Sequence, residues 1–71
     1  MKIVFDVPDT VAETLKIVAK RCAREESTHG PLTVKAMFAM LAEDLAMTET
    51  RPGSWEAANM VQVFTSHGYS I

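Results

Sequence analysis

The chain has 71 residues, a formal net charge of −2 and a single cysteine, which limits it to one small domain and excludes an intrachain disulfide. A chain this short buries only about 60% of its unfolded surface, so it usually needs a metal, a disulfide or a second subunit. Cys22, His29 and His67 are too few and too scattered for a zinc site. No cofactor or metal is therefore expected, and association with a second subunit remains.

The composition also bears on location and on the class of partner. Asp6 interrupts the first apolar run, which argues against a signal peptide, and no apolar run approaches the ~20 residues of a transmembrane helix. With one unpaired cysteine, a cytoplasmic protein without membrane contact is expected. The acidic balance counts against nucleic-acid binding, because phosphate neutralisation needs basic groups, although these can gather on one face.

Residues 2–7 alternate in polarity, which predicts a half-buried β-strand. Ile3, Phe5 and Val7 would point to one side, and Lys2, Val4 and Asp6 to the other. Pro8 should end the strand, because proline has no amide hydrogen to donate.

A first amphipathic helix should follow, with Asp9 or Thr10 as its N-cap and Thr10 and Glu13 as a capping box, and end near residues 25–26. Its apolar stripe contains Val11, Leu15, Val18 and Cys22, flanked by Ala12 and Ala19, so Cys22 is expected to be buried. Lys16, Lys20 and Arg24 lie on the opposite side. We interpret them as a solvated face, with Glu13 near Lys16, in preference to a phosphate-binding stripe.

The polar residues 26–31 should form a break, and Thr33 should cap a second helix from Val34 to about Met47. Its apolar residues extend around more than one side, which is typical of a helix buried on two sides. In so short a chain, the second side is expected to meet another subunit.

A second turn around residues 51–53 should precede a third helix, capped by Ser54 and ended by His67 and Gly68, with the glycine in a left-handed conformation. A strand over residues 60–65 is the alternative, since Val61, Val63 and Thr65 also alternate. The helix is favoured.

A single strand cannot satisfy its own backbone groups, so its partner is expected to be the same strand of a second chain, paired antiparallel about a two-fold axis. The pattern Ile3-x-Phe5-x-Val7-Pro8, with the first helix and the apolar residues of the second, resembles the ribbon-helix-helix family of Arc-like repressors and antitoxins. The resemblance covers residues 2–47. It implies a mainly α fold with one short strand, a dimerisation unit over residues 1–47, and a C-terminal extension over residues 48–71 packed on the same domain.

The resemblance also implies roles for individual residues. The implied dimer core is Ile3, Phe5, Val7, Phe38, Leu41 and Leu45. The implied DNA contacts are Lys2, Val4 and Asp6 with bases, and Thr33, Val34 and Lys35 with phosphate. Of the strand residues, Lys2 can bond a guanine edge, whereas Val4 offers only contact with a thymine methyl.

No nucleophile elbow, phosphate loop or converging carboxylate pair is present, so catalysis is not expected. The first hypothesis is a homodimeric DNA-binding transcriptional regulator of the ribbon-helix-helix kind. The second is a dimer of similar fold that does not bind DNA and instead inhibits or neutralises a protein, as an antitoxin or a phage-encoded inhibitor would. Its partner surface would include Met40, Met47 and Trp55.

Overall fold

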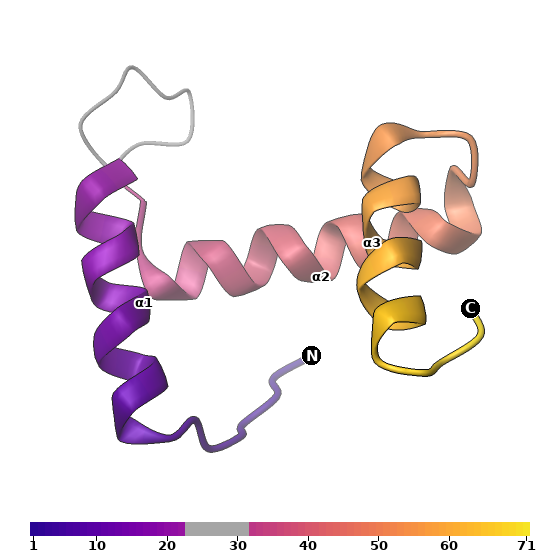
Figure 1. Ribbon diagram of the computed structural model, residues 1–71. Coiled ribbons are helices and arrows are strands. Elements are labelled where there is room, and N and C mark those ends of the chain that lie inside the picture. The colour runs from indigo at the N-terminus through magenta and orange to yellow at the C-terminus, as the bar shows by residue number, and fades with distance from the viewer. Residues whose placement is uncertain (23–31) are drawn as a thin grey trace. The chain divides into compact units, whose positions relative to one another are not determined.

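The computed structural model describes residues 1–22 and 32–71, and its secondary structure consists of three α-helices (Figure 1). Helix α1 spans Asp9–Cys22, α2 spans Val34–Thr50 and α3 spans Trp55–Ser66. The predicted mainly α class is thus confirmed. The chain divides into two compact units, Met1–Met37 and Phe38–Ile71. The predicted division into residues 1–47 and 48–71 concerns dimerisation, and it stays a prediction.

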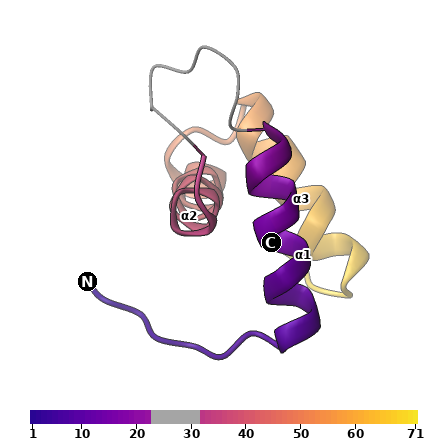
Figure 2. The same cartoon turned by 90° about the vertical axis from the view of Figure 1, so that its left-hand side faces the viewer.

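Residues 1–8 leave the start of α1 as a coil (Figures 1 and 2). No strand is assigned in the part of the chain that the structure describes. The predicted strand over residues 2–7 needs hydrogen-bonding partners from a second chain, so it too stays a prediction.

Helix α1 begins at Asp9, one or two residues earlier than its sequence suggests. The amide of Ala12 donates to the Pro8 carbonyl at 2.9 Å, so Pro8 occupies the N-cap position and Asp9 is the first helical residue. The predicted N-cap at Asp9 or Thr10 is therefore wrong. Thr10 lies inside the helix, where its carbonyl accepts a hydrogen bond from the Thr14 hydroxyl at 2.9 Å.

The buried side of α1 is centred on Ala19, which is 6% exposed, with Ala12 and Leu15 half-buried beside it. The predicted apolar stripe is only partly covered, because Cys22 lies exposed at the end of the helix. The prediction that Cys22 is buried is wrong. An apolar pattern on a helix identifies the apolar face without specifying how far along the helix that face is covered.

Thr33 caps α2 as predicted: its hydroxyl oxygen accepts from the Ala36 amide at 3.0 Å. The Thr33 carbonyl also accepts from the Met37 amide at 2.9 Å, which closes the first helical turn. The helix continues to Thr50, one turn beyond the predicted end near Met47. None of its residues is fully buried in the single chain.

Helix α3 crosses the C-terminal part of α2 within the second unit (Figure 1). Ser54 is its N-cap, with an extended backbone and a hydroxyl that accepts from the Ala57 amide at 3.1 Å. Ala57 and Met60 form the buried core of the unit, with Ala57 only 1% exposed. Residues 60–65 are helical, so the favoured prediction is confirmed over the alternative strand.

The C-terminus of α3 is a Schellman motif. Gly68 has φ +89°, and its amide donates to the Thr65 carbonyl at 3.0 Å. The Tyr69 amide reaches back to the Phe64 carbonyl at 3.0 Å, and the two rings meet edge to face with centroids 6.4 Å apart. The predicted helix stop, with a left-handed glycine at position 68, is confirmed.

Candidate binding surfaces

The N-terminal segment presents the predicted base-contacting side chains to solvent. Lys2, Val4 and Asp6 are all exposed, and Val4 retains 94% of its accessible surface. On the side predicted to enter a dimer core, Ile3 is 69% exposed and Phe5 57% exposed. In the described part of the chain no strand pairs with this segment, and its exposed apolar side chains are accessible to a macromolecular partner.

The start of α2 contains the three residues predicted to bind phosphate. The Thr33 hydroxyl accepts from the Ala36 amide, which leaves the amides of Val34 and Lys35 without acceptors inside the helix. These amides lie at the positive end of the helix dipole, and the Lys35 side chain beside them is exposed. Thr33, Val34 and Lys35 are thus neighbours in the arrangement that binds phosphate at other helix starts.

The predicted core residues of α2 share one side of the helix but are not enclosed. Phe38, Leu41 and Leu45 follow one another at helical spacing. Leu41 is exposed, whereas Phe38 and Leu45 are half-buried. The helix therefore has accessible apolar surface that a second protein could bury.

Charge is divided unequally between the two units. Six of the seven Lys and Arg residues belong to the first unit, together with five of the nine Asp and Glu residues. The second unit has four acidic residues and only Arg51 as a basic residue. The weakly acidic net charge of the chain therefore conceals an N-terminal unit of formal charge +1 and a C-terminal unit of −3.

The basic stripe of α1 behaves largely as predicted. Lys16 forms an exposed ion pair with Glu13 at 3.3 Å, and Lys20 is exposed, whereas Arg24 lies outside the described residues. A pair as exposed as this one is worth only a few tenths of a kcal/mol. Its position on the solvent side agrees with the interpretation of this stripe as a solvated face.

The three residues predicted to form a partner surface differ in accessibility. Met40 is exposed, whereas Met47 is half-buried, with its sulfur 4.0 Å from the Ser54 hydroxyl oxygen. Trp55, the only tryptophan, is 84% exposed at the start of α3. Trp55 and Met40 are therefore available for binding, whereas Met47 contributes chiefly to the packing of the turn before α3.

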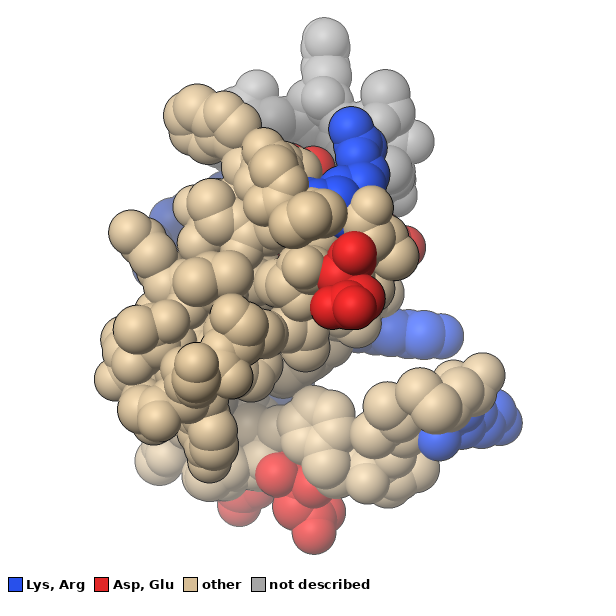
Figure 3. Space-filling model, turned by 90° about the vertical axis from the view of Figure 1, so that its right-hand side faces the viewer, with Lys and Arg blue, Asp and Glu red and all other residues tan. Residues whose placement is uncertain are grey.

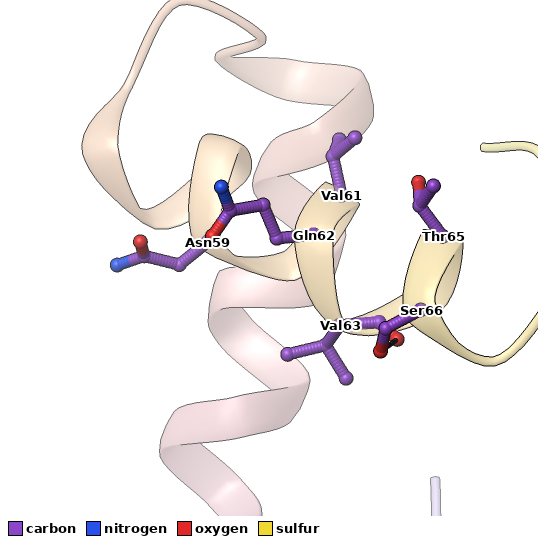
Figure 4. Close-up of a pocket in the computed structure, with 6 residues that line it drawn as sticks. All are labelled: Asn59, Val61, Gln62, Val63, Thr65 and Ser66. Carbon is purple, nitrogen blue, oxygen red and sulfur yellow. Dashed lines mark hydrogen bonds between the residues drawn. The ribbon is translucent and has the colours of Figure 1, made fainter.

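The outer face of α3 is a surface that the sequence reasoning did not identify. An open hollow of about 830 Å³ lies against it and is lined by Asn59, Val61, Gln62, Val63, Thr65 and Ser66. Asn59 and Gln62 project to the same side of the helix (Figure 4). Figure 3 shows that uncharged side chains predominate where the C-terminal unit faces the viewer. The absence of any charged residue from position 57 to position 66 was the available sequence signal.

Within residues 1–22 and 32–71, no helix has the length and apolar character required to cross a membrane. Comparisons with protein-family models, with curated proteins and with solved structures found no match to this chain.

Proposed function

We propose that this chain is a small homodimeric DNA-binding regulator of the ribbon-helix-helix kind. The observation that carries the proposal is an exposed N-terminal segment with alternating polarity, located in the unit that contains six of the seven basic residues. Electrostatic attraction to phosphate supplies much of the affinity of DNA-binding proteins, so the location of basic groups matters more than the net charge of the chain.

Dimerisation is the first step in the proposed mechanism. Residues 2–7 of two copies pair antiparallel about a two-fold axis and satisfy each other's backbone groups. Ile3, Phe5 and Val7 then turn towards the helices, where they meet the accessible face of α2 formed by Phe38, Leu41 and Leu45. The exposure of Ile3 and Leu41 in the single chain supports this step, because dimerisation would remove their apolar surface from water.

DNA recognition follows from the opposite face of the paired strands. Lys2, Val4 and Asp6 would face the major groove, where Lys2 donates to guanine and Val4 contacts a thymine methyl. The amides at the start of α2, with Thr33 and Lys35, would hold a phosphate and set the position of the ribbon on the duplex. The capped start of α2 supports this role, since its first amides have no acceptor within the helix.

The test is a titration of the full chain with DNA from upstream of its own gene, followed by gel shift at several salt concentrations. The sample is first shown to be folded and dimeric by circular dichroism and sedimentation equilibrium. Sequence-dependent shifts that weaken steeply with salt are expected. A folded dimer that shifts no DNA at low salt would refute DNA binding, and a folded monomer would refute the proposed dimer.

A second candidate function is the binding of a protein partner through the C-terminal unit, as in an antitoxin or an inhibitor. The observation that favours it is the exposed Trp55 in a unit of net charge −3, because tryptophan is enriched at binding hot spots and acidic surfaces repel DNA. The two functions use different units, so substitutions can separate them.

A further inference from the structure

We draw no further inference here: the strongest candidate, the exposed stripe of small residues Ala39, Ala42 and Ala46 along α2, carries none, because nothing in the part of the chain that the structure describes shows what would cover it.

Discussion

Replacement of Gly68 by alanine tests whether the Schellman motif stabilises the second unit. Gly68 has φ +89°, a conformation in which an L-residue brings its Cβ close to the following carbonyl at a cost of about 1–2 kcal/mol. A Cβ at this position would meet no heavy atom within 4 Å. The cost is therefore purely conformational, with no contribution from a steric clash with neighbouring side chains.

Gly53 provides a matched control on the other side of α3. A Cβ added there also meets nothing within 4 Å, but the backbone of Gly53 is not left-handed. Gly53→Ala should be neutral or stabilise the fold by up to about 1 kcal/mol, because alanine reduces the entropy of the unfolded chain. That unfolded-state effect is common to both substitutions, so the difference between the two variants isolates the left-handed cost of about 1–2 kcal/mol.

Thermal unfolding followed by circular dichroism at one fixed protein concentration measures this difference. For a domain of this size, 1 kcal/mol corresponds to roughly 4–8 °C in Tm, and the fixed concentration removes the effect of association. Gly68→Ala should therefore melt at least about 4 °C below Gly53→Ala. Gly68→Asn should lie between them, since asparagine tolerates the left-handed region better than alanine. Equal melting temperatures for the two alanine variants would refute the reasoning.

Other substitutions test separate parts of the structure and of the proposals. Ser54→Ala removes the cap of α3 and should cost about 1 kcal/mol in urea unfolding, whereas Ser54→Asp should keep most of it; an alanine variant of full stability would contradict the capping role. Lys16→Met should change the free energy of unfolding by less than about 0.5 kcal/mol, because its ion pair is exposed, and a larger loss would show an additional contact. Lys2→Ala should weaken operator binding by about 1–3 kcal/mol in the gel shift, and unchanged affinity would remove Lys2 from base recognition. Phe5→Ala should cost about 3–5 kcal/mol of dimer stability by sedimentation equilibrium if the ring is buried beneath paired strands, and unchanged dimerisation would contradict that.

The starts of the three helices show how far local sequence supports a prediction. Thr33 and Ser54 cap α2 and α3 as expected, because each hydroxyl bonds an amide only three residues away. At α1 the predicted N-cap, Asp9 or Thr10, is wrong, since the helix begins at Asp9 with Pro8 before it. Several residues there satisfy the sequence rules, and the local pattern does not distinguish among them.

The candidate surfaces likewise include some that the sequence predicts and one that it does not. The exposure of Lys2, Val4 and Asp6 follows from their place in a segment outside the helices, and the grouping of Thr33, Val34 and Lys35 follows from one helix start. The uncharged outer face of α3 was not predicted as a surface. To identify this surface one must know which side of α3 packs inward. Ala57 and Met60 mark that side only in the folded unit.

The sequence by itself determined the three helices, two of their N-caps and the left-handed glycine that ends α3. These features depend on hydrogen bonds and backbone preferences that operate within about five residues. Only the tertiary structure decided that Cys22 is exposed, that Met47 faces the turn before α3, and that Trp55 remains accessible. Burial depends on which distant residues pack against a side chain, and a helical pattern specifies the face that is apolar without specifying how much of it is covered.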